Sequence, residues 1–266
     1  MSPGVRIILM VCLAPGLFAE DGCKLGAPCY TLAGTVNGAS FEAGALAPNT
    51  LVSIFGTNLS FVTKAISFDD VAGGVLPTEL PTTGVRVHFN NQPAHMYYVS
   101  PTQVNLLVPS NAVAGASKMQ LVRDGTAGPS MWVEVKEVAP ALFLLEPGTA
   151  VASRADFSVV TKDAPARPGE VVILWATGLG PTVPRIGYGQ VPLSAVWIER
   201  IAEFHVLLNE KAVPAGNILY AGVAPYFGGL YQINMRLPED VDDDPEVRIA
   251  VGDAISPVEV RLPVRK

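Results

Sequence analysis

LVSIFGTNL at residues 51–59 and VVILWATGL at residues 171–179 are two versions of one apolar segment that ends in a turn. Three further blocks follow each copy in the same order, namely 87–90 and 206–209, 93–94 and 214–215, and 103–109 and 232–238. Four matching blocks in one order indicate an internal duplication. The copies lie roughly 120 residues apart, a spacing that suits a whole domain and is too long for a solenoid unit.

Short apolar runs recur along the chain and are bounded by Gly, Pro and Asn. They lie at 51–55, 85–89, 95–99, 104–108, 119–123 and 131–135. Within 85–89, apolar Val85 and Phe89 alternate with polar Arg86 and His88, as in a strand with one buried face. Short strands separated by turn residues are typical of a β-sandwich. The sequence therefore predicts an all-β protein made of two tandem immunoglobulin-like β-sandwich domains.

The duplication also predicts where the domains begin and end. We expect a signal peptide at 1–19, an N-terminal arm at 20–29, a first immunoglobulin-like domain at 30–138, and a linker with the second immunoglobulin-like domain at 139–266. Ala139 and Pro140 open the connection, and the apolar residues 141–145 predict a linker that packs against the domains.

The N-terminus has the pattern of a secretory signal. Arg6 supplies a weak positive charge, residues 7–18 are largely apolar, and Ala19 is a small residue at which cleavage can fall. The apolar run is too short to span a bilayer, which takes about 20 residues. A buried strand or helix is the alternative interpretation. The pattern favours a secreted or cell-surface protein, and no second apolar run reaches membrane length.

Composition and charge narrow the class of protein. Apolar residues make up 49% of the 266 residues and charged residues 16%, which is enough for a buried core and too few charges for a disordered chain. The formal net charge is −6. Nucleic-acid binding depends on clustered Lys and Arg, and the sequence has no basic run.

The cysteines predict one disulfide. Cys12 would leave with the signal peptide, so that Cys23 and Cys29 remain as a pair in a secreted chain. A zinc site is the alternative, but two cysteines without a nearby histidine cannot supply four ligands. We expect the pair to stabilise the N-terminal arm.

The sequence predicts no catalytic, cofactor-binding or metal-binding residues. The three histidines, His88, His95 and His205, stand in no His-x-Glu or His-x-x-x-His spacing, and no Gly-x-Ser-x-Gly is present. A triad assembled from distant residues stays open, because triads are defined by geometry. The acidic run at 239–246 lacks the glycine and terminal Glu of an EF-hand, so we expect a solvated turn.

Several recurring residues have structural interpretations. Gly56 and Gly178 follow apolar strands and are expected to take positive φ in a turn. Trp175 replaces Phe55 in the second copy and is expected in the core. The pairs Gln103–Asn105 and Gln232–Asn234 each share one strand face, which favours a polar anchor to a neighbouring loop over a binding site. Residues 194–204 are compatible with a short helix or with a loop.

At the repeat blocks the sequence resembles a known family, the duplicated Solibacter-type C-terminal domain of secreted acidobacterial proteins. The resembling stretches are 37–41, 47–59, 80–85, 98–109, 167–181 and 221–238. The 51–59 segment, with Gly56, Thr57 and Asn58, is also similar to the signature turn of TIG-type immunoglobulin-like domains. The resemblance implies secretion and immunoglobulin-like folds, and it supplies no catalytic residue. In other members the module ends a longer protein.

The function predicted from these observations is a secreted, non-enzymatic module for extracellular adhesion, scaffolding or assembly. Its partner would be a protein or a glycan, and self-association through sheet edges is a further possibility. A carbohydrate-binding accessory protein is the main alternative, and a hydrolase with an unrecognised site is the other. Aromatic residues in flexible loops are the candidate partner-binding residues, namely Tyr188, Tyr226 and Phe227.

Overall fold

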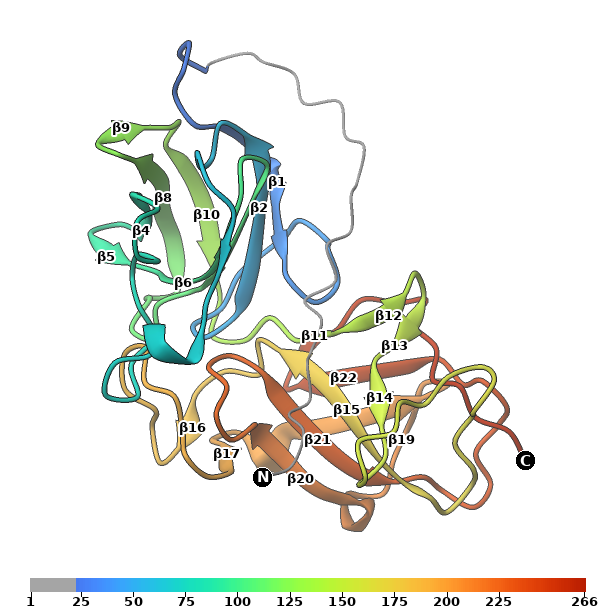
Figure 1. The fold of residues 1–266 in the computed structure, drawn as a ribbon. Helices are drawn as coiled ribbons and strands as arrows, with labels where there is room; N and C mark the ends of the chain where they lie inside the picture. The colour runs from blue at the N-terminus through green and yellow to red at the C-terminus, as the bar shows by residue number, and fades with distance from the viewer. Residues whose placement is uncertain (1–22) are drawn as a thin grey trace.

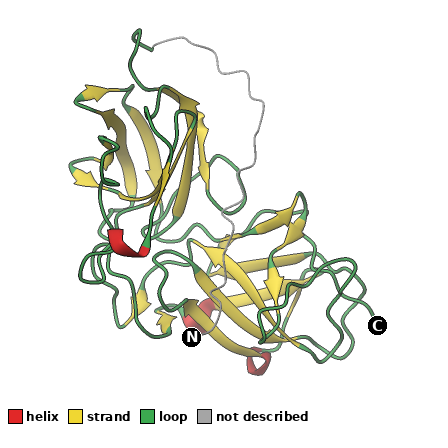
Figure 2. Cartoon of the chain, in the orientation of Figure 1, coloured by secondary structure: helices red, strands yellow, loops and turns green. Residues whose placement is uncertain are grey.

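The computed structural model describes residues 23–266, which form two β-sandwich domains joined end to end (Figure 1). The signal peptide predicted at 1–19 lies outside the described residues. Helix is limited, in the described part, to three single turns of 3₁₀ type at Phe68–Asp70, Ile201–Glu203 and Ala215–Asn217 (Figure 2). None of the helices in this part is long or apolar enough to cross a membrane.

The first domain packs two five-stranded antiparallel sheets against each other. One sheet has the order β1 (Cys29–Asn37), β2 (Leu51–Thr57), β7 (Gln103–Leu107), β6 (His95–Val99), β3 (Lys64–Ala65). The facing sheet has the order β10 (Met131–Val135), β8 (Gly115–Arg123), β4 (Val85–Phe89), β5 (Gln92–Pro93), with β9 (Thr126–Ala127) also on β8.

The second domain has the same two-layer plan. Its larger sheet has the order β11 (Ala141–Leu142), β15 (Val171–Thr177), β21 (Tyr231–Arg236), β20 (Ile218–Val223), β17 (Val196–Ile198), β16 (Thr182–Val183), with β14 (Ala152–Ser153) also on β15. The smaller sheet has the order β19 (Lys211–Ala212), β18 (Phe204–Leu208), β22 (Val247–Val251), β23 (Ala254–Ile255). A hairpin of β12 (Leu144–Glu146) and β13 (Thr149–Ala150) stands beside them.

The central strand pair has one register in both domains. In the first domain β2 pairs with β7 so that Phe55 lies opposite Gln103. In the second domain β15 pairs with β21 so that Trp175 lies opposite Gln232. These are the residues that the two copies of the repeated segment align with one another. Side chains that correspond in sequence therefore point to corresponding faces of the two sandwiches.

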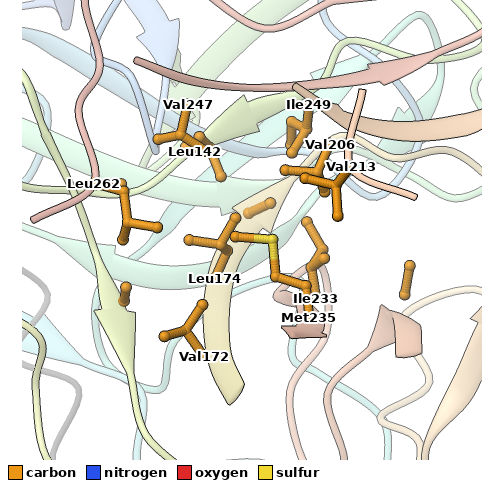
Figure 3. Packing of buried hydrophobic residues seen from close by; sticks show 14 of the residues in the cluster. Leu142, Val172, Leu174, Val206, Val213, Ile233, Met235, Val247, Ile249 and Leu262 are labelled. Atoms are coloured by element: carbon orange, nitrogen blue, oxygen red, sulfur yellow. The ribbon is translucent and has the colours of Figure 1, made fainter. Parts of the chain in front are cut away.

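Alternate residues of these strands build two separate cores. In the second domain Leu174 and Ile233 face Val206 and other side chains of the opposite sheet (Figure 3). In the first domain Ile54 aligns with Leu174, belongs to the core and is fully buried. Each fully buried aliphatic side chain of this size stabilises the fold by about 1.5–3 kcal/mol.

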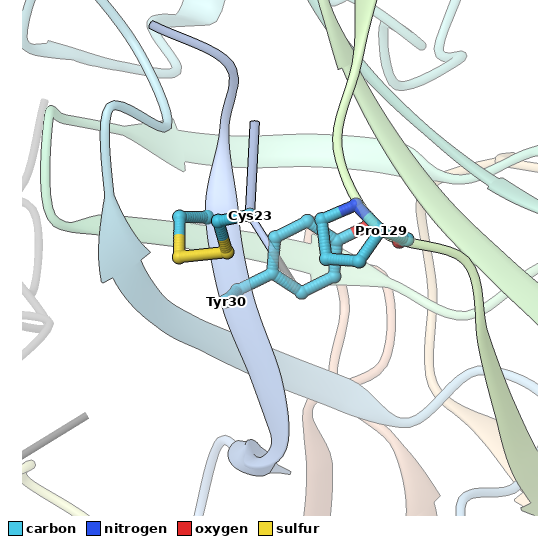
Figure 4. The surroundings of a disulfide bond; sticks show 4 residues. Cys23, Tyr30 and Pro129 are labelled. Atoms are coloured by element: carbon cyan, nitrogen blue, oxygen red, sulfur yellow. A yellow bond between two sulfur atoms is a disulfide. The ribbon is translucent and has the colours of Figure 1, made fainter. Parts of the chain in front are cut away.

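The N-terminal arm is fastened to the first domain by a disulfide and by Tyr30. Cys23 and Cys29 are joined, with 5.4 Å between their Cα atoms, and this confirms the predicted pairing (Figure 4). The Tyr30 hydroxyl donates to the Pro129 carbonyl at 2.6 Å and accepts from the Leu121 N–H at 2.7 Å. Burial raises the pKa of Tyr30 to about 12, against the opposing effect of the bond from Leu121.

A buried arginine also holds the arm. The Arg123 guanidinium donates to the Asn58 carbonyl and, at 2.8 Å, to the Gly26 carbonyl of the arm. The Phe61 ring covers its outer side, with 3.8 Å from the guanidinium carbon to the ring centroid. The arm is thus part of the sandwich.

The prediction for Gly178 is confirmed, and the prediction for Gly56 was wrong. Gly178 has a φ of +77°. Gly56 instead lies inside β2 opposite Tyr30, where an added Cβ would come within 2.1 Å of the Cys29 carbonyl oxygen. In the first domain the turn conformation falls on Asn58, which aligns with Gly178 and has a φ of 55°. Gly56 is needed for the close approach of β1.

Residues 194–204 form mostly extended structure. Strand β17 covers Val196–Ile198, a single 3₁₀ turn follows at Ile201–Glu203, and β18 begins at Phe204. In β17 the Ile198 side chain enters the core while Trp197 points away from it. The short helix is therefore limited to one turn.

Removing the Tyr30 hydroxyl should destabilise the first domain. Tyr30→Phe leaves the buried Leu121 N–H and Pro129 carbonyl without their partner, and we expect a loss of about 1–3 kcal/mol in the free energy of unfolding. Urea denaturation followed by circular dichroism measures it. Tyr98→Phe is the matched control, because the Tyr98 hydroxyl makes no hydrogen bond to the described residues. Equal stability of the two variants would contradict the role given to Tyr30.

Candidate functional site

A row of four residues crosses the outer face of the larger sheet in the second domain. Trp175 on β15 pairs with Gln232 on β21, Gln232 pairs with Gly222 on β20, and Gly222 pairs with Trp197 on β17. We call these four residues the tryptophan row. Neighbouring strands lie about 4.8 Å apart, so the two tryptophans stand roughly 14 Å apart across the sheet.

Strand alternation decides which way the tryptophan row faces. Leu174, Ile233 and Ile198, which are sequence neighbours of three members of the row, are core residues. Because successive side chains point to opposite faces of a sheet, the row lies on the side away from the core. The tryptophan row is therefore on the face that the smaller sheet does not cover.

The prediction that Trp175 lies in the core was wrong. Its side chain is only partly buried, and its indole Nε1–H donates to the Ser153 hydroxyl at 3.1 Å. Strand β15 has no polar side chain before Thr177, so its sequence shows no alternation from which the outer face could be recognised. The hydrogen bond to the neighbouring strand β14 satisfies the indole and fixes the plane of the ring.

Trp197 is the more exposed tryptophan of the row, with 43% of its surface accessible. The Tyr220 ring packs edge-on against it, with 4.9 Å between ring centroids. The Tyr220 hydroxyl lies 2.8 Å from the Val223 carbonyl and 3.1 Å from the Val196 carbonyl. An added Cβ on Gly222 would come within 2.5 Å of this hydroxyl, so the glycine makes room for the tyrosine that supports Trp197.

Gln232 lies between the two tryptophans, and Asn234 follows it two residues along β21 on the same face. Gln232 Nε2 donates to Asn234 Oδ1 at 2.8 Å, and both residues are partly buried. The pairing uses one donor group and one acceptor. Gln232 Oε1 and Asn234 Nδ2 have no hydrogen-bond partner within residues 23–266, so the face offers one free acceptor and one free donor.

The corresponding amides of the first domain are closed off. Gln103 Nε2 donates to Asn105 Oδ1 at 2.9 Å, as in the second domain, but both residues are buried. The Ser53 hydroxyl donates to the same Asn105 oxygen, also at 2.9 Å. The expected anchor is thus present in the first domain, although its partner is a neighbouring strand and not a loop.

The three loop aromatics predicted as partner-binding residues lie at or beside the domain junction. Tyr188 is partly buried there, since its hydroxyl donates to the Pro93 carbonyl of the first domain and its ring centroid lies 4.3 Å from that of His95. Tyr226 is 67% exposed and Phe227 is also exposed. Tyr188 therefore holds the domains together, while the other two keep open surfaces. Binding by any of the three stays a prediction.

Main-chain and side-chain hydrogen bonds both cross the domain junction. The Leu76 N–H donates to the Gly189 carbonyl, and the Val191 N–H donates to the Gly74 carbonyl, both at 2.8 Å. Side chains add further bonds. Tyr97 donates its hydroxyl to the Gly228 carbonyl at 2.8 Å. These bonds join the 74–76 segment and Tyr97 of the first domain to residues 189–191 and Gly228 of the second.

Thr177 supplies another bond between the domains. Its hydroxyl accepts from the Leu51 N–H at 3.0 Å and donates to the Gly229 carbonyl at 2.8 Å. Leu51 and Thr177 are the first residue of β2 and the last of β15. The two copies of the repeated segment therefore meet at the junction.

The acidic run at 239–246 forms a turn between β21 and β22, and most of its side chains are at least partly exposed. Asp244 pairs with Arg265, and Asp242 accepts from Asn209 at 2.9 Å. The bond from Arg265 lowers the pKa of Asp244. Within the described residues, no group of three or more His, Cys, Asp or Glu side chains is arranged to hold a metal ion.

Known proteins give only distant likenesses. No protein-family model and no curated protein match the sequence. The chain is similar to the surface glycan-binding protein PbSGBP-B of Prevotella bryantii, with 13% identity over 85% of this chain and 41% of that one, and a TM-score of 0.27. The SGBP-B of a Bacteroides ovatus mixed-linkage glucan utilization locus gives 10% identity, coverages of 93% and 46%, and a TM-score of 0.37.

Domains 5–6 of the S-layer protein SbsC match 89% of this chain with 98% of their own length, at 9% identity and a TM-score of 0.27. This chain spans less than half the length of the two glycan-binding proteins. With TM-scores this low, the likenesses carry no functional argument. The tryptophan row is therefore interpreted from its own geometry, and the acidobacterial resemblance stays a prediction.

Adding a methyl group to Gly189, which lies against His95, should weaken the domain junction. Gly189 has a φ of +64°, and an added Cβ would come within 2.1 Å of the His95 ring. We expect Gly189→Ala to lower the free energy of unfolding by about 1–3 kcal/mol, through overpacking against His95 together with the strain of an alanine at positive φ. Denaturant unfolding measures the change. Gly187→Ala is the matched control in the same loop, because its Cβ would meet only the flexible end of Gln190, at 3.1 Å. Similar losses in both variants would contradict this account.

Proposed function

We propose that the protein is a non-catalytic, extracellular glycan-binding module and that the tryptophan row is its binding surface. The observation that carries the proposal is that Trp175 and Trp197 lie on one outer sheet face, with a free acceptor on Gln232 between them and a free donor on Asn234 next to it. This is the carbohydrate-binding alternative stated from the sequence, and it is compatible with adhesion, since a module that binds an extracellular glycan anchors whatever it is attached to.

The chemistry of the tryptophan row suits a sugar. One face of a pyranose ring is lined by C–H groups, which pack against the flat, apolar face of an indole. The hydroxyls at its edge both donate and accept, and they match the free acceptor of Gln232 and the free donor of Asn234. Because these side chains are uncharged, the row favours a neutral glycan. The spacing of the tryptophans suits an oligosaccharide or polymer segment lying across the strands.

The aromatic side chains are held in place before any ligand binds. The Ser153 hydroxyl orients Trp175, and the Tyr220 ring supports Trp197. Tyr220 is itself fixed by its contacts with two main-chain carbonyls. Side chains that are already ordered lose little conformational entropy on binding, so more of the contact energy contributes to affinity.

The non-catalytic part of the proposal rests on what the row contains. The side chains of the row and of the neighbouring Asn234 are indole and amide groups, and neither type acts as a general acid, a general base or a nucleophile at neutral pH. The usual glycoside hydrolysis mechanism needs a pair of carboxylic groups beside the scissile bond. The extracellular part is supported by the Cys23–Cys29 disulfide, which is typical of oxidising compartments.

Replacing the tryptophans of the row should abolish glycan binding. We expect Trp175→Ala and Trp197→Ala each to weaken binding at least about tenfold, which corresponds to 1.4 kcal/mol, and the double variant to bind no glycan. Affinity electrophoresis in gels that contain neutral soluble polysaccharides measures this, and calorimetry on the best ligand gives the dissociation constants. Tryptophan fluorescence reports contact directly.

The third tryptophan supplies the matched control. Trp132 lies on β10 of the first domain and is 65% exposed, so Trp132→Ala removes an equally large exposed ring away from the row. We expect its binding to equal that of the unchanged protein. A double variant that folds normally and still binds would show that the row is not the site. A panel of neutral glycans with no ligand for the unchanged protein would overturn the proposed function itself.

A further inference from the structure

His95 is a buried histidine at the domain junction with one unpaired nitrogen. It begins β6 and is 1% exposed. Its Nδ1 lies 2.8 Å from the Leu76 carbonyl oxygen. A carbonyl oxygen only accepts, so the hydrogen of the neutral ring is on Nδ1 and Nε2 is the unprotonated nitrogen. Nε2 is buried and has no hydrogen-bond partner among the described residues.

The second domain seals this nitrogen from solvent. The Tyr188 ring lies against the imidazole, with 4.3 Å between the ring centroids. Gly189 approaches so closely that an added Cβ would come within 2.4 Å of Nε2. The Gly189 carbonyl also accepts from the Leu76 N–H, next to the carbonyl that holds Nδ1. The ring is thus enclosed between its own domain and the 187–190 loop of the other.

A proton on Nε2 would therefore have no favourable position. It would place a second N–H and a positive charge in a buried site that has no acceptor for them, and an unpaired buried charge is strongly unfavourable. Moving the 187–190 loop away would expose Nε2 to water and remove this penalty. The movement would break the hydrogen bonds that this loop makes to the first domain, from the Leu76 N–H to the Gly189 carbonyl and from the Tyr188 hydroxyl to the Pro93 carbonyl.

The neighbouring titratable groups offer no compensating negative charge. Among the titratable side chains on β6 and on the 187–190 loop are Tyr97 and Tyr188, and burial raises the pKa of both. They are therefore neutral in acidic and neutral solution. The 74–77 segment and β7, which pairs with β6 beside His95, have no ionisable side chain.

The charged groups that flank these segments are already paired. Glu79 forms an ion pair with Arg86 at 2.6 Å, and Glu199 forms one with Arg185 at 3.2 Å. Burial lowers the pKa of His95, against the opposing effect of its bond to Leu76. This direction agrees with the geometry, because both disfavour the protonated ring while the domains are docked.

We propose that the domain junction is an acid-sensitive joint, in which protonation of His95 releases the 187–190 loop of the second domain from the first domain. The inference is independent of the proposed glycan site. The ligand that drives the change is the proton, and the segment that moves is the 187–190 loop, which covers Nε2.

The pH range follows from linkage. A solvent-exposed histidine titrates near pH 6.5, and His95 titrates lower while the junction is closed. The open form therefore binds more protons than the closed form below about pH 6.5. Between that value and the lower pKa of His95 in the closed form, the equilibrium constant for closing should fall by up to about tenfold for each pH unit, and it should be constant above about pH 6.5. The joint is closed at neutral pH and opens as the solution becomes acidic.

The test follows loop opening and histidine protonation in the same mature chain between pH 7.5 and pH 5. Hydrogen exchange of residues 187–191, corrected for the intrinsic effect of pH, reports opening, and small-angle X-ray scattering reports separation of the domains. Nuclear magnetic resonance of the imidazole groups reports protonation. We expect protection to fall and the radius of gyration to rise together with the protonation of His95.

The other two histidines provide matched controls. His88 lies on β4 and His205 on β18, so His88→Gln and His205→Gln should keep the acid response, while His95→Gln should lose it. Opening of His95→Gln with the same pH dependence as the unchanged protein would overturn the proposal. If this variant is already open at neutral pH, the measurements on the unchanged protein decide between the outcomes. Protonation of His95 that coincides with opening of the loop supports the proposal. Protonation without opening, or no protonation down to pH 5, refutes it.

Discussion

The antiparallel pairing of β15 with β21 is the constraint on which the second domain depends. The register that places Trp175 opposite Gln232 also places Leu174 opposite Ile233, one step along the strands. The first pair points outward and the second fills the core. A slip of one residue would exchange the two faces and would bury the amides while exposing the aliphatic side chains. The burial of the core therefore determines the position of the proposed binding surface.

The ends of the same strands determine how the domains meet. Thr177 is the last residue of β15, and its hydroxyl binds the first residue of β2. The connection between the domains is held as well, since the Ala139 N–H donates to the Gly178 carbonyl at 2.9 Å. Gly178 takes a positive φ there, and an added Cβ would come within 2.0 Å of the Ala139 carbonyl oxygen. The turn that closes the second repeated segment is thus also a part of the junction, whereas Asn58 in the turn of the first segment lies beside Arg123 and the N-terminal arm.

Much of the fold could be predicted from the sequence, and the surfaces could not. Turn residues, short apolar runs and the cysteine pair are local signals, and they predicted the strands and the Cys23–Cys29 disulfide. Gly56 was misinterpreted because the reason for a glycine there is the approach of β1, which is remote in sequence. Trp175 was misplaced because an apolar strand does not show which face is covered. Tyr188 was assigned to an open loop because its contact with His95 exists only when the domains are docked.

The difference between the two copies explains why the proposed site lies in the second domain. Both copies retain the amide pair, which bonds in the same way in each. In the first domain Ser53 stands beside Asn105 and donates to it, whereas in the second the aligned residue is Ile173, which has no hydrogen-bonding group. The first pair is buried, and the second is left partly accessible beside tryptophans. The same amide arrangement thus stabilises one sandwich and, in the other, leaves polar groups free at the proposed site.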